Sequence, residues 1–395
     1  MKKRILLLAC LLISVITVSA ERSPEAQALL NIFNNIYGNK VIICSMANVN
    51  WNITEAENVY SWTGKYPAMT TFDFIHAPYS KDVNIQGWID YSDMRIIKDW
   101  WQKGGIVSCM WHWLQQRDDG NGMSFYSSET SFDPSKINDP SSAEYAKMVS
   151  DMDQIAGYFK QMKDLGIPVV WRPLHEAAGN TNNYPNGTAW FWWGSKGANA
   201  FIQLWRFMHD YFTDTKGLNN IIWVWNGGIN DDDWYPGDEY VDVVGDDYYG
   251  SNIYNINASW NHLKNSFPNK FVALTECGNS GTNLLPPMED IWDFAGKWLW
   301  AMPWYDYAYN DANDRTHTQH DYHTWFVEAM QLDYALDREA MKSLLDAEMT
   351  SVDTIEMSDA ADDSPLYDLH GIRVLGNPAP GIYIRNGKAI VIGRQ

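Results

Sequence analysis

Residues 166–194 read GIPVVWRPLHEAAGNTNNYPNGTAWFWWG, and they join a predicted strand to a cluster of aromatic and ionisable side chains. It opens with an apolar, β-branched run from Ile167 to Val170, which predicts a buried parallel strand. The run ends in a cluster of aromatic and ionisable side chains: Trp171, Arg172, Pro173, Leu174, His175 and Glu176. A lone glutamate there would suggest only an ion pair with Arg172. In this company, at the carboxyl end of a buried strand, it indicates the active-site edge of an α/β barrel.

The rest of the chain repeats this pattern of a short apolar run, a polar or aromatic end and a longer amphipathic segment. Eight such runs stand out: Val41 to Ala47, Tyr66 to Phe74, Gly105 to Trp113, Ile167 to Glu176, Asn220 to Asn226, Val241 to Tyr249, Phe271 to Cys277 and Trp298 to Trp304. Their spacing predicts helices at Pro24 to Tyr37, Met94 to Gly104, Ala143 to Leu165, Ala198 to Phe212, Ile291 to Lys297 and His323 to Ala347.

Eight strands alternating with helices predict an α/β fold, a (β/α)8 TIM barrel. A doubly wound open sheet is the alternative, but no glycine-rich phosphate fingerprint follows any of the predicted strands. We expect the catalytic domain to occupy residues 21–349. An acidic linker should follow at 350–365, and a short β-rich tail at 366–395.

The sequences at the two ends of the chain suggest targeting signals. A basic start, a short apolar run and Val18-Ser19-Ala20 predict a cleavable signal peptide at 1–20, hence a secreted, periplasmic or outer-surface protein. Lipid attachment at Cys10 is the less favoured alternative. In the tail, Asn386-Gly387 between two β-branched runs predicts a hairpin. The tail resembles the short β-rich C-terminal sorting segments of proteins exported across a Gram-negative outer membrane, and a small docking hairpin is the other interpretation.

Composition narrows the class of ligand. The formal net charge is −20, so nucleic acid and anionic membranes are poor partners, whereas a neutral ligand is not repelled. The chain contains 21 Trp and 22 Tyr, more than one core needs, and the indoles of residues 190–193 suggest a stacking surface for flat, weakly charged rings. Cys44, Cys109 and Cys277 lie in apolar runs without metal spacing, which indicates buried free thiols.

Two glutamates at the ends of two different predicted strands are the residues that glycoside hydrolysis requires. Glu176 follows the fourth run and Glu276 lies in Thr275-Glu276-Cys277-Gly278 at the end of the seventh. One carboxyl must protonate the leaving oxygen while the other attacks the sugar or activates water. Carboxyls about 5 to 5.5 Å apart would retain the sugar's configuration, and a wider gap would invert it.

The motifs WRPLHE, WFWWG and LTECG resemble glycoside hydrolase family 26, whose best-known members are endo-β-1,4-mannanases. The resemblance covers residues 43–347, and His175 before the glutamate distinguishes this family from other retaining barrels. It implies that Glu176 is the acid/base and Glu276 the nucleophile. The stretch between Ala177 and Ala189 is longer than the family pattern, which leaves fine specificity and endo versus chain-end action open.

The resemblance also implies substrate-binding roles. His112 matches a histidine at the subsite of the attacked sugar, and His175 would hydrogen-bond around the site. Trp190 and Trp304 match sugar-stacking tryptophans, with core packing as the alternative for both. In Gly245-Asp246-Asp247-Tyr248-Tyr249, side-chain alternation places Asp247 and Tyr249 on one face. Tyr249 would then donate to the nucleophile, and Tyr248 would replace it if the register is shifted by one.

The sequence therefore predicts a secreted, retaining endo-1,4-β-mannanase that acts on mannan, glucomannan or galactomannan without a cofactor or metal. A β-glucanase or xylanase on the same scaffold is the nearest alternative, and a non-catalytic glycan-binding barrel is the alternative from another class. Arg172 would orient neighbouring carboxylates. The acidic loop Asp231-Asp232-Asp233 has the composition of a calcium site, but such loops are usually solvated. The oligomeric state is not readable, and a monomer is expected.

Overall fold

The computed structural model describes residues 21–280, 283–305 and 322–353, together with short pieces at 365–368, 373–374, 378, 381–385 and 388–392. The predicted signal peptide with Cys10, most of the acidic linker and the Asn386-Gly387 turn lie outside the described residues. Among the helices that are described, none combines the length and apolar character needed to span a bilayer.

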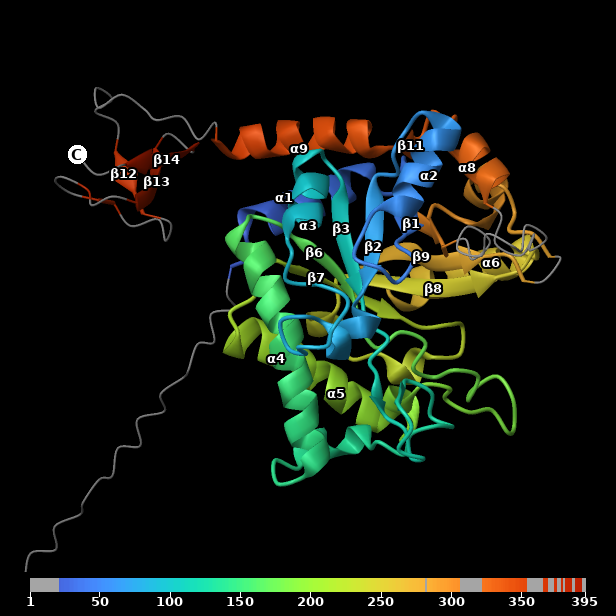
Figure 1. The fold of residues 1–395 in the computed structure, drawn as a ribbon. Coiled ribbons are helices and arrows are strands. Elements are labelled where there is room, and N and C mark those ends of the chain that lie inside the picture. Colours follow the sequence, from blue (N-terminus) through green and yellow to red (C-terminus); the bar gives the residue numbers. More distant parts are fainter. Residues whose placement is uncertain are drawn as a thin grey trace, which may run out of the picture.

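Eight parallel strands form the closed barrel that the sequence predicts (Figure 1). They are β1 (Val41–Met46), β2 (Met69–Asp73), β3 (Ile106–Met110), β6 (Val169–Arg172), β7 (Ile221–Asn226), β8 (Val243–Tyr249), β9 (Phe271–Gly278) and β10 (Trp300–Pro303). Each pairs with the next, and β10 returns to β1, where Ile42 lies opposite Trp300 and Ile43 opposite Ala301. This closure excludes the open doubly wound sheet.

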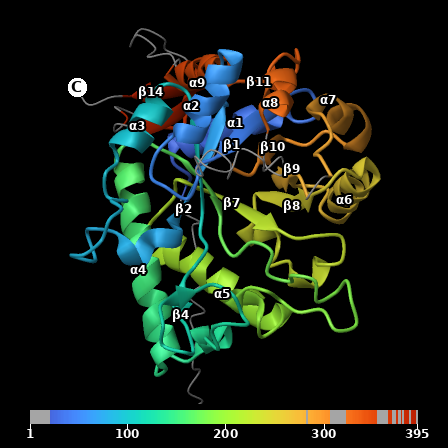
Figure 2. The ribbon, with the colours of Figure 1, turned by 45° about the vertical axis from the view of Figure 1, so that its right-hand side comes forward.

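Helices surround the barrel, as Figure 2 shows for α3, α4, α5 and α6. The α-helices are α1 (Pro24–Ile36), α2 (Thr54–Thr63), α3 (Arg95–Gln102), α4 (Ala143–Asp164), α5 (Ala198–Asp210), α6 (Ile253–Ser266), α7 (Met288–Asp290), α8 (His323–Ala329) and α9 (Arg338–Asp353). Short 3-10 turns lie at Phe74–Tyr79, Pro134–Asn138, Trp192–Gly194, Asp232–Trp234 and Asp238–Tyr240. π-Helical turns at Tyr211–Thr215 and Ile291–Ala295 extend α5 and α7.

The prediction of one closing helix from His323 to Ala347 is wrong. The segment forms α8 and α9, and β11 (Ala335–Leu336) lies between them and pairs with β1. The apolar spacing is helical, but pairing with a distant strand overrides it. The second helix also runs to Asp353, past the expected domain end at residue 349.

Side-chain alternation along each strand separates the barrel interior from the layer under the helices. In β6, Val170 and Arg172 point into the barrel, whereas Trp171 points outward and packs edge-on against Phe159 of α4, with ring centroids 4.9 Å apart. Trp171 is fully buried. Mainly apolar residues therefore fill both layers, and the ionisable groups of the site gather at the carboxyl ends of the strands.

Helix α4 illustrates why the helices form where the sequence places them. Ser142 caps its first turn, because its Oγ accepts a hydrogen bond from the backbone N–H of Tyr145 at 3.1 Å. Its buried residues recur at helical spacing and include Met148, Met152, Ile155, Phe159 and Met162. This stripe packs against the outer face of the barrel and ends where Gly166 begins the approach to β6.

Two smaller sheets complete the described structure. A two-stranded ladder joins β4 (Gln115–Gln116) to β5 (Met123–Ser124) in the loop after β3. In the tail, β12 (Leu366–Tyr367), β13 (Gly381–Arg385) and β14 (Lys388–Ile392) form an antiparallel sheet, and β13 and β14 pair along their whole length. The three cysteines of the barrel are buried and unpaired, as predicted.

Candidate active site

The ends of β6, β8 and β9 bring their polar residues together at one mouth of the barrel. β8 and β9 shift register after Asp246, so that Asp247 lies opposite Glu276. Asp247 and Tyr249 share the inward face of β8, while Asp246 bonds to Ser259 of α6 outside the barrel. Tyr248 also points away, since its hydroxyl accepts the backbone N–H of Asn252 at 2.9 Å.

Glu276 is held by two donors and is 4% exposed. Its Oε1 accepts a hydrogen bond from Nη2 of Arg172, and its Oε2 accepts one from the Tyr249 hydroxyl at 2.8 Å. Burial raises the pKa of Glu276 to about 7, and Asp247 adds to this shift, whereas Arg172 and Tyr249 lower it. Both donors favour the charged form, which is the form a nucleophile needs.

Glu176 has fewer partners, although it is close by. Its Oε2 accepts a hydrogen bond from Nε1 of Trp190 at 2.8 Å. Burial, followed by the charges of Asp247 and Glu276, raises its pKa well above the usual range. One carboxylate oxygen each from Glu176, Asp247 and Glu276 lie within 4.8 Å of one another. A single proton shared in this cluster therefore resides on Glu176, because Arg172 contacts the other two.

The same three carboxylates are near enough to ligate a cation, but the Arg172 guanidinium already contacts two of them. Its Nη1 lies 3.0 Å from Oδ2 of Asp247, and its Nη2 contacts Glu276. Arg172 is itself 3% exposed, so this cation compensates two buried anions. The expected role of Arg172 in orienting carboxylates fits this geometry, while the absence of a metal stays a prediction.

Two histidines form the wall beside Glu276. His112 Nδ1 is 2.5 Å from Oδ2 of buried Asp73, and the two Nε2 atoms of His112 and His175 are 3.2 Å apart. Burial lowers the pKa of His175 well below its usual range, and the charges of Arg172 and His112 lower it further. His175 is therefore neutral, and the structure brings both predicted histidines to the same site.

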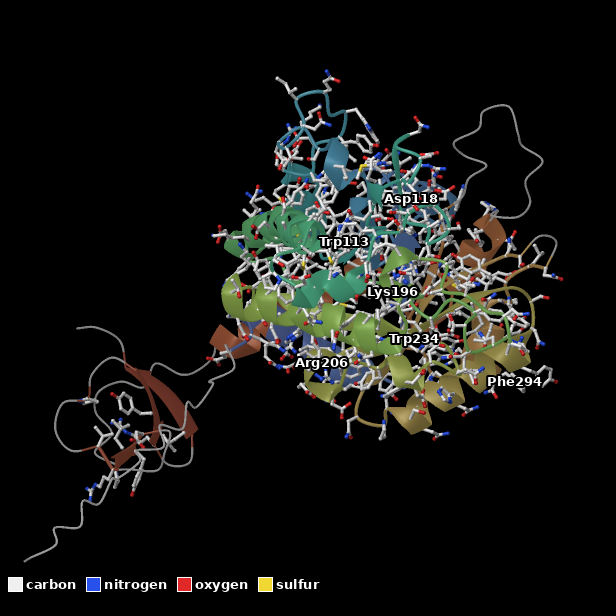
Figure 3. All side chains as sticks on the ribbon, turned by 90° about the horizontal axis from the view of Figure 1, so that it is seen from below. Trp113, Asp118, Lys196, Arg206, Trp234 and Phe294 are labelled. Atoms are coloured by element: carbon white, nitrogen blue, oxygen red, sulfur yellow. The ribbon has the colours of Figure 1, made fainter. Side chains whose placement is uncertain are left out.

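The aromatic residues divide between the site and the core. Trp190 and Trp304 are partly exposed, and the Trp304 ring lies 6.0 Å from that of His112. The expectation that the indoles of residues 190–193 form a stacking surface is wrong for Trp192 and Trp193, because a 3-10 turn directs both into the core, where they are fully buried. Trp113, labelled in Figure 3, is also buried under the helices, where its Nε1 donates to Oδ2 of Asp151 on α4 at 2.8 Å.

The long loop of residues 177–189 is hydrogen-bonded to the acidic loop that follows β7. Nδ2 of Asn182 donates to the carbonyl of Asn230 at 2.7 Å and to Oδ1 of Asp233 at 3.1 Å. Asp231 accepts the backbone N–H of Gly228 at 2.7 Å, and Asp232 lies 2.7 Å from His262. These aspartates thus have protein partners. This favours an ordinary acidic loop rather than a calcium site.

Sequence reasoning missed two buried residues at the site, Asp73 and Asn226. Asp73 ends β2 and holds His112, and Asn226 ends β7 and accepts the backbone N–H of Glu176 at 2.8 Å. Both occupy the last position of a strand, and both strands were predicted. Searching every predicted strand end for a polar residue, including those without motifs, would have found them.

Comparison with known proteins identifies the family of this chain. The family model described as glycosyl hydrolase family 26 matches residues 18–330. A mannan endo-1,4-β-mannosidase of Thermothelomyces thermophilus is 32% identical over 73% of this chain and 56% of its own length. The chain spans about half the length of the curated relatives that it matches.

Two solved structures share the barrel. The family 26 domain of an endo-β-mannanase/endo-β-glucanase from Prevotella bryantii is 35% identical with a TM-score of 0.74, over 82% of this chain and 98% of that one. A β-mannanase from a symbiotic protist of the termite Reticulitermes speratus is 29% identical with a TM-score of 0.66, over 82% and 96% of the two chains. The sequence match and the shared barrel together show that this chain belongs to glycosyl hydrolase family 26.

Proposed function

We propose that this protein is a retaining endo-1,4-β-mannanase. The observation that carries the proposal is the pair Glu176 and Glu276, whose carboxylate oxygens lie within 4.8 Å of each other. Inverting glycosidases need about 6.5 to 9.5 Å between their carboxyls to admit a water molecule, whereas retaining enzymes need about 5 to 5.5 Å. The spacing supports direct attack by one carboxylate on the sugar.

In the first step, the ionised Glu276 attacks the anomeric carbon while Glu176 donates its proton to the glycosidic oxygen. The bond to the leaving sugar breaks, and an ester forms between the attacked sugar and Glu276. Arg172 and Tyr249 hold Glu276 in place, and Asp247 and burial keep Glu176 protonated beforehand. Each glutamate therefore begins in the protonation state that its role requires.

In the second step, Glu176 changes from acid to base. Esterification removes the charge of Glu276, so one of the anions that raise the pKa of Glu176 disappears. Glu176 then takes a proton from water as the water attacks the anomeric carbon, and the ester bond to Glu276 breaks. The product keeps the β configuration, and both glutamates return to their starting states.

The substrate assignment rests on chemistry and on relatives. The partly exposed indoles of Trp190 and Trp304 suit the apolar faces of neutral sugars, and an acidic chain does not repel them. Several curated relatives are named mannan endo-1,4-β-mannosidases, and the protist enzyme was solved with a gluco-manno-oligosaccharide. We further propose that the protein is exported through its residue 1–20 leader, which N-terminal sequencing of the mature protein would test.

The test is product release from linear mannan, galactomannan, xylan and barley β-glucan, together with the anomeric configuration of the first product by NMR. We expect cleavage of mannan with retention, and losses of several orders of magnitude in Glu176→Ala and Glu276→Ala. Asp246→Asn is the matched control, because Asp246 is a partly buried carboxyl on the same strand as Asp247 that points away from the site. Binding of mannan without cleavage would instead indicate a glycan-capture protein, and inversion would exclude the proposed mechanism.

A further inference from the structure

Asn226 connects the backbone of Glu176 to the next strands of the barrel. This side chain is 5% exposed, its Oδ1 accepts the N–H of Glu176 at 2.8 Å, and its Nδ2 donates to Oγ1 of Thr275 at 3.0 Å. A backbone N–H can only donate, so the amide oxygen of Asn226 must face Glu176 and its nitrogen must face Thr275. The side chain is thereby fixed in one orientation.

The connection continues to the nucleophile. Oγ1 of Thr275 accepts the hydrogen bond from Asn226, and its own hydroxyl donates to Oδ1 of Asp247 at 2.7 Å, the nearer and charged acceptor, rather than to the carbonyl of Asp246 at 3.1 Å. The other oxygen of Asp247 bonds to Arg172, which also bonds to Glu276. A continuous series of hydrogen bonds therefore links the backbone of one catalytic glutamate to the carboxylate of the other across β7, β8 and β9.

The backbone of Glu176 needs such support. Glu176 has φ +49°, and Leu174 two residues earlier has φ +51°, in the left-handed region that residues with a side chain rarely adopt. Conformations of this kind persist only where surrounding contacts hold them. The bond to Asn226 is made at the strained residue itself, so it acts where the direction of the Glu176 side chain is decided.

Gly245 of β8 leaves room for the side chain of Thr275 in the barrel wall. A Cβ added to Gly245 of β8 would lie 2.3 Å from Cγ2 and 2.7 Å from Oγ1 of Thr275. Real Cβ atoms do not approach other atoms so closely, so a side chain at position 245 would displace Thr275. The glycine thus allows Thr275 to reach both Asn226 and Asp247.

We propose that Asn226 is a positioning residue for Glu176, and that the series Glu176, Asn226, Thr275 and Asp247 sets the spacing of the two catalytic carboxyls. The inference rests on the proposed glycosidase function. It concerns the proton-transfer role of Glu176 and leaves the attack by Glu276 largely independent of Asn226. The two roles can be separated by the choice of leaving group.

The experiment compares mannan with 2,4-dinitrophenyl β-mannobioside, whose leaving group departs without a proton. For Asn226→Ala we expect kcat/KM on mannan to fall about 100-fold, because misplacing a catalytic group by about 1 Å costs this much. On the dinitrophenyl substrate kcat/KM should fall less than about threefold. Azide should raise kcat on that substrate, since it replaces the water that Glu176 would activate.

Asn226→Asp provides a second measurement, which tests whether the side chain at position 226 lies next to Glu176 in the working enzyme. An aspartate accepts from both Glu176 and Thr275, which turns the Thr275 hydroxyl away from Asp247 and adds a negative charge beside Glu176. The basic limb of the kcat/KM profile on mannan should therefore move to higher pH. An unchanged basic limb in a folded variant would overturn the proposal.

Asn220→Ala is the matched control. Asn220 is also a buried asparagine beside β7, but it lies at the opposite end of the strand and bonds to the carbonyl of Ile167 at 2.9 Å. Its replacement should lower stability without changing the ratio of the two activities. If Asn226→Ala reduces kcat/KM equally on both substrates, Asn226 is structural and the inference fails. The inference also fails if the ratio of the two activities in Asn226→Ala is the same as in Asn220→Ala. If the wild type cleaves neither substrate, the proposed function fails instead.

A pair of threonine variants keeps the test decisive if Asn226→Ala does not fold. Thr275→Val is isosteric but lacks the hydroxyl, and we expect about a tenfold loss on mannan with little change on the dinitrophenyl substrate. Thr275→Ser retains the hydroxyl and should restore most of the mannan activity. Equal activity of these two variants would overturn the proposed series.

Discussion

Replacing Tyr249 with phenylalanine tests how the ionised state of Glu276 is maintained. The variant removes one hydroxyl, which donates to Oε2 of Glu276 at 2.8 Å, and keeps the ring. A hydrogen bond to a charged group contributes about 1.5 to 3 kcal/mol. Because Tyr249 is 37% exposed, we take the lower value. About 1.5 kcal/mol corresponds to roughly one pKa unit and a tenfold change in rate.

The sign follows from the state that the hydroxyl stabilises. It favours ionised Glu276, so its loss raises the pKa of that carboxyl above the value of about 7 in the native site. Glu276 must be ionised to attack, so the acidic limb of the pH profile of kcat/KM should move up by roughly one unit. At a pH below this limb the variant should lose about tenfold more activity than at a pH above it.

The assay is the pH dependence of kcat/KM for a soluble manno-oligosaccharide, measured for wild type and Tyr249→Phe. Tyr248→Phe is the control, because the Tyr248 hydroxyl accepts the Asn252 backbone N–H and makes no contact with Glu276 that the structure describes. An acidic limb at the same pH in wild type and Tyr249→Phe would refute the reasoning. A shift of the acidic limb to lower pH would refute it as well.

Three further changes affect stability. Contacts with His112 lower the pKa of Asp73 despite its burial, so Asp73→Asn should lower the melting temperature at pH 7. The difference should shrink as the pH falls below about 4, because the unfolded wild-type chain takes up a proton there before the folded protein does. An equal difference at pH 3 would contradict this. Arg172→Met leaves two buried carboxylates without their cation. The free energy of unfolding, measured with denaturant, should fall by about 3–5 kcal/mol at neutral pH and by less in acid. A loss that does not become smaller on acidification would contradict the ion-pair account. Trp171→Ala should cost about 3–5 kcal/mol in the same assay, whereas Trp88→Ala, at a residue 54% exposed, should change little; similar losses would contradict the assignment of Trp171 to the core.

Much of the barrel could be predicted because its strands are marked locally. Each of the eight predicted runs contains one barrel strand, since buried parallel strands are short, apolar and bounded by turns. The grouping of Glu176, Glu276, Asp247 and Tyr249 was also predictable. All four lie at or just after carboxyl ends of strands, and those ends share one edge of the barrel.

What could not be predicted depends on distant contacts. The break between α8 and α9 arises because Ala335 and Leu336 pair with β1, almost three hundred residues earlier in the chain. The direction of Trp192 and Trp193 depends on a 3-10 turn whose place in the fold is set by other loops. The left-handed conformation of Glu176 has no sequence signature, because it is held by Asn226 from the next strand.

The pairing of β1 with β10 constrains how the chain can mature. Ile42 finds its partner only when Trp300 has been made, so a growing or partly translocated chain carries two unpaired strand edges until that point. Contacts so far apart in sequence also form slowly. Truncations that end before Pro303 should therefore aggregate rather than accumulate as smaller domains.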